Sequence, residues 1–470
     1  MFARVCVMVG IVAGCGSAWA EDTVRVDGAA SDWESVLTIP PERSDAGNAW
    51  ARWAAAAPSM EDLSDDEHDL LMESSIFLGT AEENLVAMRE LISRWAATAS
   101  ALRLEPGEYV QLPRPRGVAG MADASPLRTL VRLGSTWIEI AWRDGRSDDA
   151  IDGLADMFAC VDAGMRDNGG IVGLLTAAVA TDLALARARW LMDRHDIDEE
   201  QLARIDRALA QGEDVSLDGL RHGLAAEYQC VFRVVVERLP ETRDIDSLLR
   251  WVAAMGLETP REEGRERVFG ESPRELLDVD ATYELCGRPL AEYIRSIGDG
   301  WTPDGWTRGP GSYAARLRAE LGITGVRLLE HDGAALPADV VASVRQDLAN
   351  VSNPIGKLLA AMMAAPVDGL SWTAFKTTTT RRALRVYGAL RVLQLRGEGL
   401  PESLEALVRD GGIDRRVSPT DPMSGRLFGF DRERRMLWSV GRDGVDDGGI
   451  GDETNFGGSR DLVWVLPELD

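Results

Sequence analysis

Cysteine and histidine are scarce in this sequence. The 470 residues include five cysteines and four histidines. Two cysteines, Cys6 and Cys15, precede the expected folded part, and Cys160, Cys230 and Cys286 lie far apart among apolar or helix-forming neighbours. A thiol in such surroundings behaves as a small buried hydrophobic group. The pattern excludes a disulfide-rich scaffold, and no two cysteines have the spacing of zinc ligands.

Positive charge is also limited. The chain has 51 lysines and arginines against 77 aspartates and glutamates, which leaves a formal net charge of -26. Binding to nucleic acid or to an anionic membrane surface depends on a cationic face. We therefore expect no nucleic-acid partner. The hydrophobic share of 45% is large enough to build a sizeable core, which excludes a wholly disordered chain.

Familiar catalytic motifs are missing from the sequence. It contains no G-x-S-x-G, H-E-x-x-H, S-x-x-K, P-loop or G-x-G-x-x-G pattern. One cluster, Asp65-Asp66-Glu67-His68-Asp69, could bring carboxylates and an imidazole to a metal. We interpret it instead as the first turn of a helix that begins at Ser64, because carboxylates stabilise helix N-termini.

The first residues are typical of an export signal. A short cationic start and an apolar run at Val5–Ala13 precede Ala18-Trp19-Ala20, which offers small residues where a signal peptidase cleaves. A second interpretation stays open, because Val12-Ala13-Gly14-Cys15 resembles a bacterial lipobox, with a lipid anchor at Cys15. The apolar run is shorter than the roughly 20 residues that span a bilayer. Both interpretations predict an extracytoplasmic protein, either periplasmic or secreted, or a membrane-anchored lipoprotein.

Helix is the dominant expectation after residue 49. Ala, Leu, Arg and Glu prevail, and apolar residues recur at helical spacing. Capping residues and Gly breaks bound the clearest helices, expected over 125–143, 147–166, 171–194, 198–209 and 216–238. The helix over 171–194 is apolar on nearly every side, but Asp182 and Arg187 interrupt it. We therefore expect a buried central helix and no transmembrane span in the mature chain.

The pattern changes near the C-terminus. After a helix over 377–397 and a short helix from Leu400, three strand-like runs follow at 427–430, 436–440 and 462–466. The predicted fold is mainly α, an irregular antiparallel helical array with a small C-terminal α+β module of one helix and a three-stranded antiparallel sheet. The predicted parts are a signal peptide 1–20 (or lipoprotein leader 1–14), a polar arm 21–48, a helical domain 49–256, a linker 257–271, a second helical group 272–376 and the module 377–470.

Four segments of this module resemble a known family in the same order. They are Leu400–Leu407, Thr420–Gly425, Ser439–Gly444 and Arg460–Leu462. Together they look like the head domain of the major pseudopilin of type II secretion systems. The tail, with Asn353–Leu359 before it, also resembles secreted, mostly helical proteins of planctomycete type. The chain lacks the long hydrophobic assembly helix with which a pseudopilin begins, so the resemblance does not imply filament formation.

The pseudopilin resemblance implies a calcium site in the loop before the last strand. Asp443 and Asp461 match the family by position, whereas Asp446, Asp447 and Asp452 are candidates by composition. Ca²⁺ takes six to eight hard oxygen ligands, which an acidic, glycine-rich loop can supply. The alternative is a solvated acidic loop without a metal.

Two functions follow as hypotheses. The favoured one is an exported, non-catalytic helical protein that acts through protein interactions in the cell envelope, with an envelope or secretion-related partner and a calcium-stabilised module. The alternative is an extracytoplasmic hydrolase whose carboxylates come from separate helices, beside Trp301 or Trp306 in a cleft.

Overall fold

The computed structural model describes eleven stretches of the chain. They are 32–41, 47–57, 62–77, 82–95, 102–105, 108–114, 125–238, 277–297, 351–409, 417–451 and 461–468. Several predictions fall outside these residues: the export signal with Cys15, the linker 257–271, both loop tryptophans Trp301 and Trp306, and Asp452.

Most of the described residues are helical, as the sequence predicts. The helices are α2 (Asp32–Val36), α3 (Trp50–Ala56), α4 (Asp65–Phe77), the 3-10 turn η3 (Glu82–Asn84), α5 (Leu85–Arg94), α7 (Ser125–Arg143), α8 (Ser147–Arg166), α9 (Ile171–Met192), α10 (Glu199–Gln211), α11 (Val215–Glu227), the π-helical turn η4 (Tyr228–Phe232), α12 (Arg233–Arg238), α14 (Val279–Ser296), α17 (Pro354–Leu395) and α18 (Leu404–Arg409).

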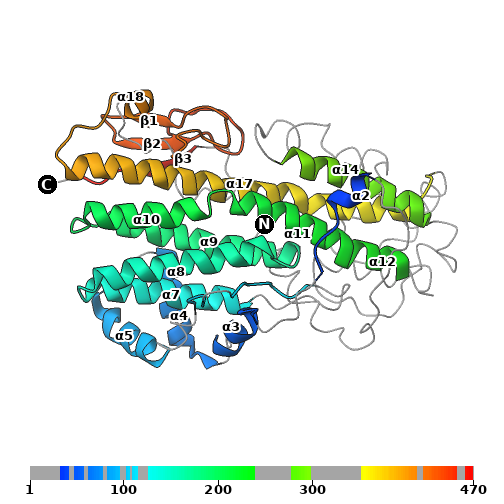
Figure 1. Cartoon of the computed structure of the whole chain (residues 1–470), viewed down its shortest axis with the longest axis horizontal. Coiled ribbons are helices and arrows are strands. Elements are labelled where there is room, and N and C mark those ends of the chain that lie inside the picture. The colour runs from blue at the N-terminus through cyan, green and yellow to red at the C-terminus, as the bar shows by residue number, and fades with distance from the viewer. Residues whose placement is uncertain are drawn as a thin grey trace, which may run out of the picture.

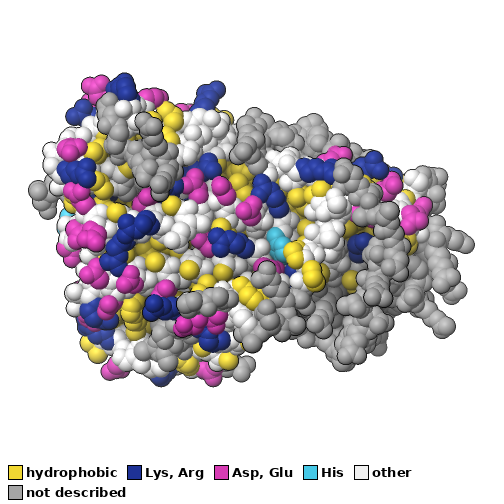
Figure 2. All heavy atoms as spheres, in the orientation of Figure 1, with side chains coloured by type: hydrophobic (Ala, Val, Ile, Leu, Met, Phe, Trp, Pro, Cys, Tyr) yellow, Lys and Arg dark blue, Asp and Glu magenta, His cyan; other side chains and the backbone are white. Residues whose placement is uncertain are grey.

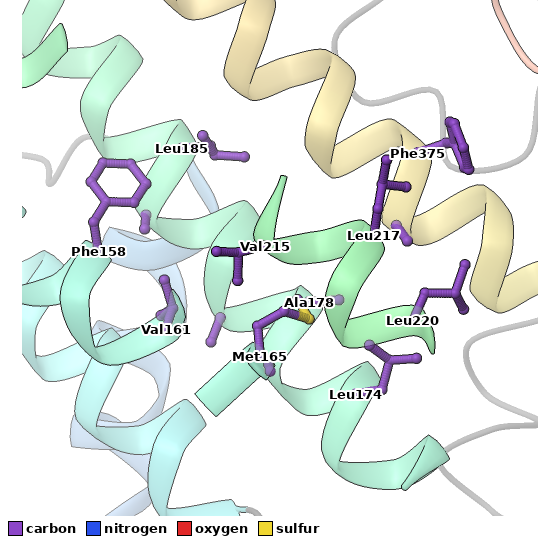
Figure 3. Close-up of a cluster of buried hydrophobic side chains, with 14 of the residues drawn as sticks. Phe158, Val161, Met165, Leu174, Ala178, Leu185, Val215, Leu217, Leu220 and Phe375 are labelled. Carbon is purple, nitrogen blue, oxygen red and sulfur yellow. The ribbon is translucent and has the colours of Figure 1, made fainter. Parts of the chain in front are cut away.

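The core lies between the long helices of the body. Figure 1 shows α7, α8 and α9 side by side, with α9, α10 and α11 packed against α17, while α3, α4 and α5 lie against the outer side of α7. Apolar side chains from α8, α9, α11 and α17 meet in the interior (Figure 3): Phe158, Val161, Met165, Leu174, Ala178, Leu185, Val215, Leu217, Leu220 and Phe375. Removing this apolar surface from water is the main stabilising contribution.

Helix α9 lies in the middle of the body. Among the described helices it is the one with the length and hydropathy of a membrane span, but half of that stretch is buried against its neighbours. Its Arg187 is fully buried, where it donates to Ser135 Oγ at 3.0 Å and lies 3.4 Å from Glu139 Oε2. This position agrees with the expectation of a central helix of the body.

Helix α17 is longer than the sequence predicts. The rules for proline predict a helix that ends at Ala365, before Pro366, and a second helix that starts at Thr377. The structure instead has one helix of 42 residues from Pro354 to Leu395, so the expected module boundary at 377 lies inside it. Beyond Pro366 the helix buries Val367 and Leu370, and this packing offsets the missing proline N–H.

Buried charges fix how α17 lies on the other helices. Arg381 is 1% exposed and forms two hydrogen bonds to the Asp162 carboxylate of α8, at 2.6 and 3.0 Å. Arg385 pairs with Asp206 of α10 at 2.9 Å and also with Glu213. Because a buried guanidinium is costly without its partner, these pairs favour one register of the helix against its neighbours.

The C-terminal module has the predicted sheet. Strands β1 (Gly429–Asp431), β2 (Met436–Ser439) and β3 (Leu462–Val465) form an antiparallel sheet in the order β1-β2-β3. Alternation along β2 gives the sheet two faces, and the fully buried Leu437 marks the inner face. Figure 1 shows the sheet lying along one end of α17.

The end of β3 is tied to the helical body. The Val465 carbonyl accepts hydrogen bonds from Arg189 of α9 at 2.7 Å and from the Tyr387 hydroxyl of α17 at 3.3 Å. Gln394 of α17 donates to the Pro467 carbonyl at 3.3 Å. The module is therefore attached to both helices and does not hang from a linker.

The described part of the polar N-terminal arm, 32–41 and 47–48, includes a short helix that packs on the body. Within it, α2 places Trp33 edge-on to Tyr228 of η4, with ring centroids 6.3 Å apart. Trp33 is only 9% exposed. This single aromatic anchor explains why a mostly polar stretch still packs on the body.

Candidate cation-binding loop

The candidate site is the loop that leaves β2 and returns to β3. Its described part runs from Gly441 to Gly451, and Gly451 then forms a bridge to Asp461 at the start of β3. Gly449 has a φ of 75°, and a Cβ atom there would lie 2.1 Å from Met436 Cε. The backbone conformation favours glycine at this position, and the Met436 side chain would have to move to accept a larger residue.

Asp461 is the buried centre of this loop. It is 0% exposed, and its carboxylate accepts hydrogen bonds from the backbone N–H groups of Gly449 at 2.8 Å and Asp447 at 3.1 Å. Burial raises the pKa of Asp461, the two amides lower it, and the carboxylates of Asp446 and Asp447 raise it further. Three negative groups are therefore near enough to repel one another.

The structure brings only some of the predicted acids together. Asp446 Oδ1 accepts hydrogen bonds from Trp438 Nε1 and from the Gly448 N–H, both at 2.9 Å. Asp443 accepts from the Val445 N–H at 2.9 Å, which is a local turn contact. We call Asp446, Asp447 and Asp461 the acidic cluster, because the charges of the first two act on Asp461. Asp443 caps a local turn instead.

The loop offers carboxylate oxygens, which hard cations prefer, but these oxygens do not form a complete coordination shell. In the described part of the chain, no group of three Asp, Glu, His or Cys side chains has the arrangement of metal ligands. Both oxygens of Asp461 already accept backbone amides. Carboxylates that repel one another around a buried acid are nevertheless the groups that Ca²⁺ would neutralise. Of the described acids in this loop, Asp446 and Asp447 are the ones whose charges act on Asp461, but the three carboxylates are not arranged as metal ligands.

An arginine that the sequence analysis missed also faces the loop. Arg434, in the turn between β1 and β2, donates to the carbonyls of Gly448 at 2.9 Å and Gly449 at 3.4 Å. Its guanidinium brings positive charge beside the acidic cluster. The charged turn at 431–435 gave no sign of this role, because the contact depends on how the loop folds back over the sheet.

A second buried acid joins the turn over 420–425 to the end of β2. Asp421 is 1% exposed and accepts hydrogen bonds from the Met423 and Val440 N–H groups and from the hydroxyls of Ser424 and Ser439, at 2.7 to 3.2 Å. Burial raises its pKa although these donors oppose the shift. Asp421 thus holds the Thr420–Gly425 turn against the end of β2.

The other acidic cluster has a structural explanation. Ser64 and Glu67 cap α4 reciprocally, with Glu67 N to Ser64 Oγ at 3.3 Å and Ser64 N to Glu67 Oε2 at 2.9 Å. Glu67 also pairs with Arg94 at 2.6 Å. His68 lies 3.7 Å from Asp69, whose side chain is 87% exposed. This is the helix N-terminus that the sequence predicts.

An open groove of about 600 Å³ lies between α2 and α14. Its walls alternate in charge along the exposed face of α14, where Arg288 lies 3.8 Å from Glu284. The lining residues are Trp33, Glu34, Asp280, Tyr283, Glu284, Arg288, Glu292 and Arg295. Such alternation is typical of a solvated helix face.

Comparisons with protein-family models, curated proteins and solved structures found no match to this chain.

Proposed function

We propose that this chain is an exported, non-catalytic helical protein that acts through contacts with other proteins, and that calcium stabilises its C-terminal module. The observation that carries the calcium part is that the fully buried Asp461 carboxylate, whose pKa burial raises, also feels the negative charges of Asp446 and Asp447. Export rests on the sequence of the first twenty residues. The expected partner is an envelope or secretion-related protein.

Calcium would act by charge neutralisation. Asp446, Asp447 and Asp461 would hold it, and Asp443 and Asp452 are further candidates from the sequence. When bound, the ion turns mutual repulsion of the carboxylates into coordination. Asp461 immediately precedes β3, and Val465 at the other end of β3 accepts a hydrogen bond from Arg189, so a firmer loop would also hold the last strand on the body.

The loop also carries two exposed apolar side chains. Val445 is 53% exposed and Ile450 is 58% exposed, on either side of the acidic pair. Single exposed apolar side chains are normal on protein surfaces, so the role in protein contacts rests on the other arguments. On the face shown in Figure 2, acidic and basic side chains are interspersed, so no single-sign patch there favours nucleic acid.

A hydrolase remains the alternative proposal. Its carboxylates would be sought first in the groove between α2 and α14, where Glu34 and Asp280 lie beside Trp33. The alternating charges of that groove favour a solvated surface, so the non-catalytic function is preferred.

Thermal unfolding of the full chain tests the calcium proposal. Trp438 and Trp464 lie in the module, but they are two of the chain's 14 tryptophans, so tryptophan fluorescence reports the module together with the body. A ligand that binds only the folded form adds about 2.7 kcal/mol at a hundredfold excess over its dissociation constant. We expect a higher melting temperature in Ca²⁺ than in chelator, and a smaller effect of Mg²⁺, which requires a tighter octahedral shell.

A pair of variants separates calcium binding by the loop from a general effect of negative charge in the module. Asp446→Asn with Asp447→Asn should remove the calcium effect while keeping the chain folded. Glu402→Gln, at an exposed position just before α18, removes a negative charge from the module outside the loop and should leave the calcium effect intact. Equal melting of the unmodified chain in calcium and chelator, with no heat of binding by calorimetry, would refute the proposal.

A further inference from the structure

One carboxylate, that of Asp167, fastens an N-terminal segment of the chain to the helical body. Asp167 follows the last residue of α8, at the turn into α9. Its Oδ2 accepts a hydrogen bond from Gln111 Nε2 at 2.5 Å. Its Oδ1 lies 3.0 Å from His222 Nε2 of α11 and 3.6 Å from a guanidinium nitrogen of Arg114. The carboxylate of Asp167 is therefore the polar point at which the segment 108–114 meets α11 and the end of α8.

The segment 108–114 in turn holds earlier parts of the chain. Ala49 N donates to the Tyr109 carbonyl at 2.9 Å, and Asn48 Nδ2 donates to the Gln111 carbonyl at 3.1 Å. Arg114 also donates to the carbonyl of Pro40. If 108–114 leaves the body, the attachments of residues 40 and 48–49 leave with it.

The segment lies flat across the α8–α9 turn. The Leu112 N–H donates to the Asp167 carbonyl at 2.9 Å, and the Leu112 side chain is 1% exposed. Gly169 has a φ of 69°, and a Cβ atom there would lie 2.4 Å from the Pro113 carbonyl oxygen. Backbone contact this close needs glycine, so the turn is shaped to accept the segment.

The charges at this point favour an ionised acid. Arg114 from the segment and His222 from α11 are the charged or titratable groups that face the carboxylate in the described chain, and Gln111 adds a neutral amide. Burial alone would raise the pKa of Asp167, but the His222 contact, the Arg114 charge and the Gln111 hydrogen bond together hold it below its usual value. The Arg114 side chain is only 7% exposed, so solvent screens this pairing little.

We infer that Asp167 is an acid-sensitive clasp: when its carboxylate is protonated, the segment 108–114 detaches together with the chain around residues 40 and 48–49, while α7, α8 and α9 stay folded. A carboxyl group whose folded-state pKa lies below its unfolded value stabilises the folded state at neutral pH. That stabilisation disappears as the pH falls through the folded-state pKa. The release is therefore driven by acid and is independent of calcium.

Hydrogen exchange of the full chain at a series of pH values tests this inference. Rates are divided by the intrinsic chemical rate at each pH, and peptides covering 108–114 are compared with peptides from α7, α8 and α9. We expect protection of 108–114 to fall at acidic pH while the three helices stay protected. His222→Gln removes one partner of the acid, so the midpoint of the loss should move up by about half to one pH unit.

Two further variants complete the test. Asp167→Asn should expose 108–114 already at pH 7. Asp152→Asn removes an exposed carboxylate of α8 that pairs with Arg204 of α10, and it should leave the protection of 108–114 unchanged. The inference is overturned if His222→Gln leaves the midpoint unchanged, or if 108–114 loses protection only when α7, α8 and α9 do.

Discussion

The helical body and the C-terminal module bury their charged groups in different ways. In the body, carboxylates on one helix meet arginines on another, as Asp162 meets Arg381 and Glu139 meets Arg187. In the module, Asp421 and Asp461 are as deeply buried, but their hydrogen bonds come from backbone amides and hydroxyls. In these pairs, each buried carboxylate of the body is neutralised by an arginine of the body. Within the described residues, the buried carboxylates of the module have no arginine partner, so a bound cation can neutralise them. The predictions below test this difference, from the largest expected loss of stability to the smallest.

The largest effect should come from breaking a pair in the body. Arg381→Leu leaves the Asp162 carboxylate buried without its cation, and removing one partner of a buried pair costs about 3–5 kcal/mol. The measurement is chemical denaturation followed by circular dichroism. The double variant Arg381→Met with Asp162→Leu should recover most of the loss, since apolar residues of similar size can replace a buried pair.

An exposed pair supplies the control for this experiment. Arg396→Gln removes the contact with Glu199 at 2.8 Å, where both side chains are about half exposed, and should leave the denaturation midpoint unchanged. If Arg381→Leu were equally silent, the paired charges would not contribute to the stability of the body.

A second, smaller effect is expected in the module. Asp421→Ala deprives two backbone amides and two hydroxyls of their acceptor, and we expect a loss of about 2–3 kcal/mol. Hydrogen exchange should show it first in β2 and in the 420–425 turn. Asp421→Asn should have an intermediate effect, because its amide oxygen can still accept from one side. Equal protection in all three proteins would mean that the packing of the sheet alone holds the turn.

Much of this fold could be predicted from local signals. Helices α7 and α8 have the predicted bounds, because Ser125-Pro126 and the Gly145 break are strong markers of helix ends. The prediction that a helix ends before Pro366 was wrong. The helix continues through Pro366 because α17 packs on α9, α10, α11 and α14. Local propensity predicts helix ends poorly where tertiary packing stabilises the continued helix.

The candidate site was less predictable than the fold. Asp461 could be named from the sequence because it lies just before the predicted last strand, at the end of an acidic, glycine-rich stretch. Which acids approach it depends on how the loop folds back over the sheet, and this brings in Asp446 and Asp447 but leaves Asp443 in a turn. Asp421 and Arg434 act across distant parts of the chain, so no local pattern marks them.

The smallest expected effect concerns an acid in the body that breaks the rule of pairing with arginine. Glu227 ends α11 and accepts a hydrogen bond from the Ile171 N–H at the start of α9, at 3.1 Å. Burial raises the pKa of Glu227 to about 7, and the Ile171 contact opposes this shift. A folded-state pKa above the unfolded value means that the folded protein holds the proton longer. Stability is then complete below about pH 4.5 and is lost as the pH rises towards 7.

Glu227→Gln should remove that loss, because glutamine stays neutral and its amide oxygen can still accept from Ile171. A shift of this size corresponds to about 3 kcal/mol for an enclosed group. Since Glu227 keeps part of its surface exposed, we expect the variant to be about 1–2 kcal/mol more stable than the unmodified chain at pH 8 and equal to it at pH 4. Urea denaturation at both pH values measures the difference. A variant that is less stable at pH 8 would mean that the positive end of the α9 dipole stabilises the charged carboxylate more than burial destabilises it. In that case the body, like the module, would use backbone groups to hold a buried negative charge.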